Sequence, residues 1–157
     1  MERIVYLDNN ATTMVAPEVL DAMLPFFKDR YGNPSSMHSF GGLVAKDMLR
    51  AREQVARLLG ADNDFEITFT GTATESDNIA IRGILGYYKE KKHVITSTTE
   101  HPAVLNLCKQ LEKEGYRVTF VPVGSDGVVD VEFLKNSVTE DTAIVSIMHA
   151  NNETGVI

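Results

Sequence analysis

The sequence predicts an α/β fold built around a mostly parallel sheet. Strand-like and helix-like segments alternate along much of the 157 residues. Residues 142–148 form a nearly continuous apolar run, which is typical of a strand covered on both faces. Gly and Pro stand at the ends of several segments, where they stop or start helices. Strands that alternate with helices are typical of βαβ units, in which the strands run parallel.

The individual elements follow from periodicity and from stop signals. Pro17 suits the first position of a helix, and Gly60 suits the end of a second one. Pro25 should kink or shorten the first helix, since its ring disturbs the helix interior. The apolar stripe of that helix is Val19, Leu20, Met23, Leu24 and Phe27. The expected strands cover 3–7, 65–70, 93–97, 117–123 and 142–148. The expected helices begin at Pro17 and then cover 38–59, 75–91, 102–114 and 131–137.

Composition narrows the class of protein. Hydrophobic residues make up 43% and charged residues 24%, the balance of a soluble globular protein. The net charge of −7 argues against a nucleic-acid binder, and no apolar run is long enough to span a bilayer, so no membrane association is expected. The single cysteine, Cys108, excludes an intramolecular disulfide and a cysteine-cluster metal site. Together with the lack of a signal-peptide pattern, this favours a cytoplasmic protein.

Polar clusters follow three of the expected strands, at 69–75, 97–101 and 149–155. In open α/β sheets, ligands bind outside the carboxyl ends of the strands. Three clusters at that one edge therefore predict one shared site.

The first cluster has the features of an anion site. Gly71 allows a tight turn, and Thr72 and Glu75 have the spacing of a capping box. The N–H groups of Ala73 and Thr74 would then lie at a helix N-terminus, where phosphate binds readily, and the Thr74 hydroxyl could add a bond. The same segment taken alone is also an ordinary helix cap. It is neither a Walker A loop nor a dinucleotide fingerprint.

The other clusters offer one histidine and one asparagine. His101 precedes Pro102 and is expected at or beside a helix N-cap, where a neutral imidazole can stack on a flat ligand and exchange protons. Asn152 can hold a polar substituent of a ring. Taken alone, each is equally a capping or turn residue. Cys108 shares a helical face with apolar neighbours and is expected in the core. No histidine has ligand-like spacing, so no metal site is expected.

Five ordered motifs resemble the N-terminal part of the cysteine desulfurases of the NifS/IscS type. The similarity runs over essentially all 157 residues, in the order and spacing of that family. The motifs are YLDNNATT at 6–13, GNPSS at 32–36, TGTATESDN at 70–78, TEH at 99–101 and SIMHANNETG at 146–155.

The resemblance implies a fold-type I pyridoxal-phosphate-dependent transferase. Its large domain would be a three-layer α/β/α structure with a mainly parallel sheet, to which residues 16–157 would contribute a part. Residues 1–15 would lie on the side of a smaller domain. The implied reaction removes sulfur from L-cysteine, giving L-alanine and an enzyme persulfide for iron–sulfur cluster assembly. The implied partners are a second copy in a homodimer and an iron–sulfur scaffold protein that accepts the sulfur.

The resemblance also implies roles for single residues. Ala73 and Thr74 would bind the phosphate of pyridoxal 5'-phosphate. His101 would stack on the pyridine ring and take part in proton transfer. Asn152 would bond the 3' oxygen of the ring.

Some parts of the family pattern have no counterpart in the sequence. These are the cofactor-binding lysine in a Ser-His-Lys context, the acidic partner of the pyridine nitrogen and the cysteine that carries the persulfide. In the family they lie beyond the position of Ile157, so we expect a piece of a longer enzyme, inactive alone and with unburied helix faces. The alternatives left open are a selenocysteine lyase or other class V aminotransferase-like enzyme, a non-catalytic scaffold that keeps the front half of the fold, and a phosphate-binding module.

Overall fold

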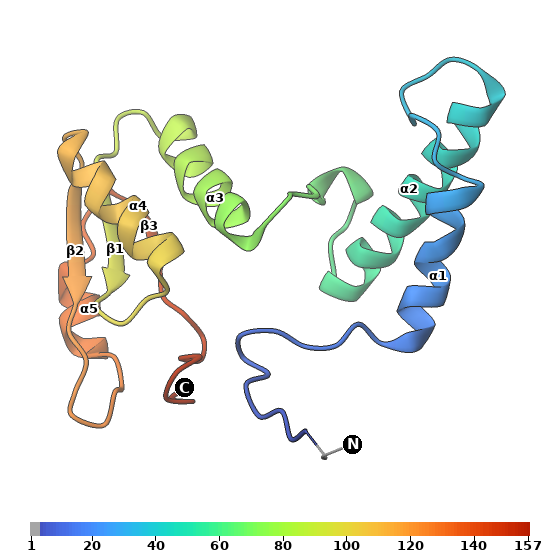
Figure 1. Ribbon diagram of the computed structural model, residues 1–157. Coiled ribbons are helices and arrows are strands. Elements are labelled where there is room, and N and C mark those ends of the chain that lie inside the picture. The colour runs from blue at the N-terminus through green and yellow to red at the C-terminus, as the bar shows by residue number, and fades with distance from the viewer. Residues whose placement is uncertain (1–3) are drawn as a thin grey trace. The chain divides into compact units, whose positions relative to one another are not determined.

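The computed structural model describes residues 4–157 and divides into two compact units (Figure 1). Unit 1 is Met1–Phe69 and unit 2 is Thr70–Ile157. Unit 1 contains only helices within its described part, whereas unit 2 contains a sheet with helices packed on it. The two units are described separately below.

Unit 1 has two α-helices and one short 3₁₀ helix. The α-helices are α1, Pro17–Lys28, and α2, Ser39–Leu59. Helix α1 starts at Pro17, continues through Pro25 and ends three residues later. Helix α2 ends at Gly60, whose φ of 73° places it in the left-handed region that glycine adopts without strain. The predicted start at Pro17 and the predicted helix 38–59 are therefore confirmed.

Two predicted strands do not form in the described part of unit 1. Residues 65–70 fall partly in the 3₁₀ helix η1, Asp64–Glu66, and then run extended without a partner strand. The carbonyl of Ile67 in this stretch accepts a hydrogen bond from the Arg52 guanidinium instead. Residues 4–7 of the predicted strand 3–7 are also unpaired, and Arg3 lies outside the described residues. The local pattern was wrong here because an apolar run favours an extended backbone but does not supply a neighbouring strand.

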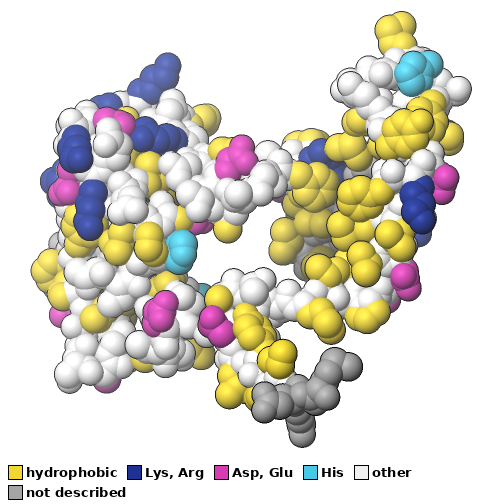
Figure 2. Space-filling model, in the orientation of Figure 1, with side chains coloured by type: hydrophobic (Ala, Val, Ile, Leu, Met, Phe, Trp, Pro, Cys, Tyr) yellow, Lys and Arg dark blue, Asp and Glu magenta, His cyan; other side chains and the backbone are white. Residues whose placement is uncertain are grey.

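Unit 1 buries few hydrophobic side chains of its own. Among its described residues, only Val44 and Ala56 are buried hydrophobic residues. The predicted stripe of α1 is exposed, from 40% at Leu24 to 71% at Phe27. Figure 2 shows hydrophobic side chains on the surface of these helices. The unburied helix faces expected from the sequence are therefore present in this unit.

Unit 2 has the predicted parallel sheet. Its strands β1, β2 and β3 lie in the order β2-β1-β3, and β1 pairs in parallel with both neighbours. The strands are His93–Ser97, Arg117–Val121 and Thr142–Ser146. The helices are α3, Ala73–Tyr87, α4, Pro102–Lys113, and α5, Val131–Ser137. Strands β2 and β3 end earlier than predicted, because pairing with β1 stops where β1 turns away after Ser97.

The core of unit 2 lies between the sheet and helices α3 and α4, which also pack against each other. Every residue of the central strand β1 is buried. The buried cluster comprises Ile81, Leu85, Val94, Val104, Leu107, Cys108 and Leu111. Burial raises the pKa of the Cys108 thiol to about 11, so this cysteine is the core residue that its helical position predicted.

A buried histidine, which the sequence did not single out, ties the three strands together. His93 at the start of β1 places Nδ1 2.8 Å from Thr142 Oγ1 of β3 and Nε2 2.9 Å from Thr119 Oγ1 of β2. Burial lowers the pKa of His93, the Arg117 charge lowers it further, and Asp141 opposes both. The imidazole is therefore neutral and structural.

No helix within residues 4–157 is long and apolar enough to cross a membrane.

Candidate functional site

The predicted site residues all belong to unit 2 and come from three places. Ala73 and Thr74 form the first turn of α3. His101 lies between β1 and α4, and Asn152 lies in the turn after β3. Because β1 and β3 are adjacent parallel strands, the last two segments leave the same edge of the sheet.

The N-terminus of α3 is capped by side chains of its own first turn. The Thr72 hydroxyl accepts a hydrogen bond from the Glu75 N–H at 3.1 Å, as the capping spacing predicted. The Glu75 carboxylate reaches back to the Gly71 N–H at 2.7 Å, one residue further than a standard capping box. The N–H groups of Ala73 and Thr74 belong to the first helical turn, which has no preceding carbonyls to bond. They lie at the positive end of a 15-residue helix.

His101 caps helix α4. Its Nδ1 accepts a hydrogen bond from the Ala103 N–H at 3.1 Å, which confirms the predicted N-cap position. The side chain is exposed, so the faces of the ring remain accessible. A neutral imidazole that accepts at Nδ1 carries its proton on Nε2. The cap therefore fixes the orientation of the ring and the nitrogen that carries the proton in the neutral ring.

Thr74 and His101 line the same groove between α3 and α4. The groove has a volume of about 430 Å³, and Arg82 adds a cation to its wall. The Arg82 guanidinium is held by Glu114, with two hydrogen bonds of 2.9 and 3.0 Å. The structure thus brings the predicted phosphate residue and the predicted ring-stacking residue to one surface. The lining that the structure describes for this groove includes neither Ala73 nor Asn152.

The turn after β3 is organised by Asn151, the neighbour of the predicted site residue. Its Oδ1 accepts hydrogen bonds from the N–H groups of Glu153 and Thr154, at 2.9 and 3.0 Å. Asn152 itself is exposed, and its amide nitrogen donates to Glu153 Oε1 at 3.2 Å. The turn therefore presents the Asn152 side chain outward, as a ligand-binding role requires.

Two side chains that sequence reasoning missed join the turn after β1 to the turn after β3. Glu100 is only 6% exposed, and its Oε1 accepts hydrogen bonds from Ser97 Oγ at 3.1 Å and from the Met148 N–H at 2.6 Å. The Asn151 amide donates to the Thr99 carbonyl at 3.2 Å. Glu100 stands directly before His101, which was the one available hint, but nothing in the pattern named its partner 48 residues away.

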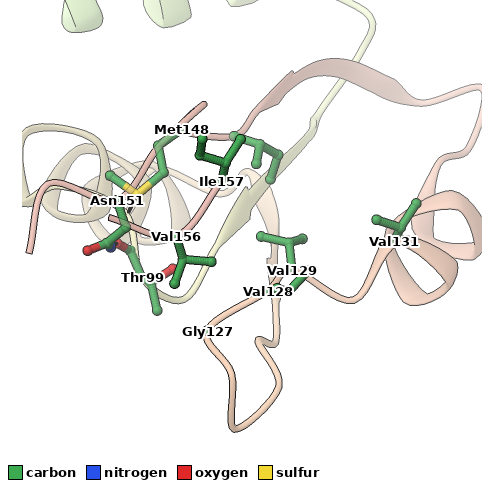
Figure 3. A pocket seen from close by; sticks show the side chains of 10 residues that line it. Thr99, Gly127, Val128, Val129, Val131, Met148, Asn151, Val156 and Ile157 are labelled. Carbon is green, nitrogen blue, oxygen red and sulfur yellow. Dashed lines mark hydrogen bonds between the residues drawn. The ribbon is translucent and has the colours of Figure 1, made fainter. Parts of the chain in front are cut away.

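An apolar cavity of about 170 Å³ lies beside these turns (Figure 3). It is lined mainly by apolar residues of the 127–131 segment and of the end of the chain, with Thr99 and Asn151 as polar members. No group of three or more metal-ligating side chains occurs within residues 4–157. The start of α3 and the exposed imidazole of His101 are the described features that a ligand could use in the groove.

Comparison with known proteins identifies a family for this chain. The pattern of the family described as aminotransferase class-V matches residues 5–157. A cysteine desulfurase of Nostoc sp. (strain PCC 7120) is 57% identical over 154 residues, which are 98% of this chain and 38% of that protein. The cysteine desulfurase NifS of Azotobacter vinelandii is 53% identical over 153 residues, again 98% and 38%. The chain thus spans about 38% of the length of these relatives.

Solved structures agree with the sequence comparison. A structure described as a NifS-like protein superposes with a TM-score of 0.88 at 46% identity, over 92% of this chain and 40% of that one. The structure of DndA from Streptomyces lividans superposes with a TM-score of 0.82 at 41% identity, over 98% and 43%.

Proposed function

The chain belongs to the aminotransferase class-V family, and from this premise we propose that it is part of a cysteine desulfurase. Its fold is the α/β fold of fold-type I pyridoxal-phosphate-dependent enzymes, of which it holds a part of the large domain. The proposed reaction takes sulfur from L-cysteine and leaves L-alanine, with the sulfur held as a persulfide on the protein. The observation that carries the proposal is the groove that joins the α3 N-terminus to His101, in a chain 57% identical to a cysteine desulfurase of Nostoc sp..

The residues present fit pyridoxal 5'-phosphate, the cofactor of this family. An anion needs donors and positive potential, which the first turn of α3 supplies. A flat ring needs an accessible planar side chain, which His101 supplies in the same groove as Thr74. A polar ring substituent needs a donor, which Asn152 supplies from the turn after the neighbouring strand. When bound, the cofactor supplies an electron sink for bond cleavage in the amino acid.

The α3 N-terminus would hold the phosphate end. The N–H groups of Ala73 and Thr74 donate to its oxygens, and the Thr74 hydroxyl adds a further donor. Thr72 and Glu75 keep this turn in place through their hydrogen bonds to each other and to Gly71.

His101 would stack on the ring and handle a proton. Its Nδ1 accepts from the Ala103 N–H, so the neutral ring carries its proton on Nε2 and would take up a second proton at Nδ1, with loss of this cap. Asn152 would donate from Nδ2 to the 3' oxygen of the ring. That bond would replace the exposed hydrogen bond from Asn152 to Glu153 Oε1, and water would then bind the Glu153 carboxylate instead.

The wider context of the enzyme is part of the same proposal. Residues 1–15 belong to the side of a small domain, and the active protein is a cytoplasmic homodimer. Its sulfur passes to an iron–sulfur scaffold protein. These statements rest on the relatives' family, to which the sequence motifs above correspond.

Ligand titration tests the cofactor role of this chain. We expect pyridoxal 5'-phosphate to bind more tightly than either inorganic phosphate or pyridoxal, because the groove offers both an anion end and a ring end. Asn152→Ala should lower the affinity for pyridoxal 5'-phosphate and leave the affinity for inorganic phosphate unchanged. The matched control is Asn136→Ala, an exposed asparagine on α5. Equal affinities for pyridoxal 5'-phosphate and inorganic phosphate would instead favour a simple phosphate-binding module.

The reaction is tested on the protein as its source organism produces it, purified from those cells and incubated with L-cysteine and a thiol reductant. We expect L-alanine and sulfide in equal amounts, because the reductant releases each persulfide sulfur as sulfide. A strong preference for L-selenocysteine would favour the lyase, and a lack of alanine would refute the proposed reaction.

A further inference from the structure

We propose that Glu100 is a positioning residue, which together with Asn151 holds His101 and Asn152 at the correct spacing for the ring of the cofactor. This inference rests on the proposed function, since it names the residues that align its ring-binding side chains. We call the pair Glu100 and Asn151 the inter-turn clamp. Neither residue contacts the ligand in this role; each acts through the backbone of the opposite turn.

The first half of the clamp is the buried carboxylate. Glu100 belongs to the turn after β1, yet its Oε1 accepts the N–H of Met148 in the turn after β3 at 2.6 Å. The same oxygen accepts the Ser97 hydroxyl at 3.1 Å. No Lys, Arg or His among the described residues forms a salt bridge with it. A buried carboxylate that is not balanced by a cation is costly, and these hydrogen bonds compensate part of that cost.

The second half runs in the opposite direction. The Asn151 amide, in the turn after β3, donates to the carbonyl of Thr99 in the turn after β1 at 3.2 Å. Figure 3 shows Asn151 beside Met148 and Thr99. The Asn151 amide also contacts Met148 Sδ at 3.4 Å. Each turn therefore supplies one side chain and receives one at its backbone.

The clamp operates where the sheet no longer joins the two segments. The paired register between β1 and β3 ends at Thr96 and Ser146. Beyond that point the backbones have no ladder to hold them, and the clamp supplies the missing cross-links. His101 directly follows Glu100, and Asn152 directly follows Asn151. The side chains that bind the ring are thus one peptide away from the side chains that set the distance between the turns.

The test compares three variants of this chain. Glu100→Ala removes both hydrogen bonds, whereas Glu100→Gln keeps an oxygen acceptor and removes the charge. Glu112→Ala, on the exposed face of α4, is the matched control. If Glu100→Ala does not fold, Glu100→Asp replaces it, since the shorter carboxylate cannot span the same distance. For each variant, we would measure amide hydrogen exchange by NMR and the affinities for pyridoxal 5'-phosphate and inorganic phosphate.

Glu100→Ala should speed exchange at the Met148 amide and through the 149–155 turn, about tenfold or more, because the clamp protects them. It should lower the affinity for pyridoxal 5'-phosphate about tenfold and change the affinity for inorganic phosphate by less than about twofold. The reason is that misplaced turns disturb only the side chains that bind the ring. Glu100→Gln and Glu112→Ala should match the wild type in both measurements. The rescue by glutamine distinguishes hydrogen-bond positioning from an effect of charge.

Different outcomes overturn different claims. If the wild type binds no pyridoxal 5'-phosphate, the proposed function fails and the positioning role falls with it. If the wild type binds and Glu100→Ala binds equally well, only the positioning role fails. The positioning role would also be overturned if Glu100→Ala lost as much affinity for inorganic phosphate as for pyridoxal 5'-phosphate. The same holds if Glu100→Gln bound pyridoxal 5'-phosphate as weakly as Glu100→Ala.

Discussion

Replacement of His93 should remove a pH dependence from the stability of unit 2. The imidazole is fully buried and bonds to Thr119 and Thr142 on the two neighbouring strands. Burial lowers the pKa of His93 below its ordinary value of 6.5. Near pH 6.5, His93 takes up a proton in the unfolded chain but stays neutral in the folded chain. The contribution of neutral His93 to the free energy of unfolding is therefore fully present above about pH 6.5 and decreases as the pH falls below it.

The expected change in the free energy of unfolding is that of protonating one histidine in the unfolded chain. If folded His93 stays neutral, the free energy of unfolding falls by about 1.4 kcal/mol between pH 7.5 and pH 5.5. This is an upper limit, because the nearby Asp141 charge favours protonation and offsets part of the shift. Asp141 and Glu114 both have a lowered pKa, so their own titration lies below this range of pH.

The assay is urea unfolding followed by far-ultraviolet circular dichroism between pH 5.5 and 7.5. His93→Asn keeps one donor and one acceptor but does not titrate, so its stability should be nearly flat relative to the wild type. His149→Asn, at an exposed histidine, should keep the wild-type slope. Equal slopes in the wild type and His93→Asn would refute the reasoning.

Three further predictions concern the core, the helix start and the cysteine. Leu111→Ala, at a fully buried position, should cost about 2–5 kcal/mol in urea unfolding, whereas Leu58→Ala, at a position 83% exposed, should change the stability little; similar losses would contradict the assigned core. Thr72→Ala should cost about 1 kcal/mol, because the Glu75 N–H loses its cap, and no loss by the same assay would argue against this cap. Cys108, with a thiol pKa of about 11, should resist a thiol reagent at pH 8 until urea unfolds the chain, so fast labelling of the folded chain would show that it is not buried.

Local chemistry predicted the parts of the site that depend on neighbouring residues. The cap at Thr72 and the cap at His101 each need only a side chain within three residues of its partner. The clamp could not be predicted in this way. The bond from Met148 to Glu100 joins residues 48 apart, and the bond from Asn151 to Thr99 joins residues 52 apart. Such pairs depend on which strands become neighbours.

The sequence by itself determined the α-helices of both units, the three parallel strands of unit 2 and the core position of Cys108. These follow from periodicity, proline and glycine signals, and apolar spacing, all of which act within a few turns of the chain. Only the tertiary structure decided that β1 lies between β2 and β3, and that residues 4–7 and 67–70 remain unpaired. It also decided that His93 and Glu100 are buried, because the burial of a polar side chain depends on partners that distant segments bring to it.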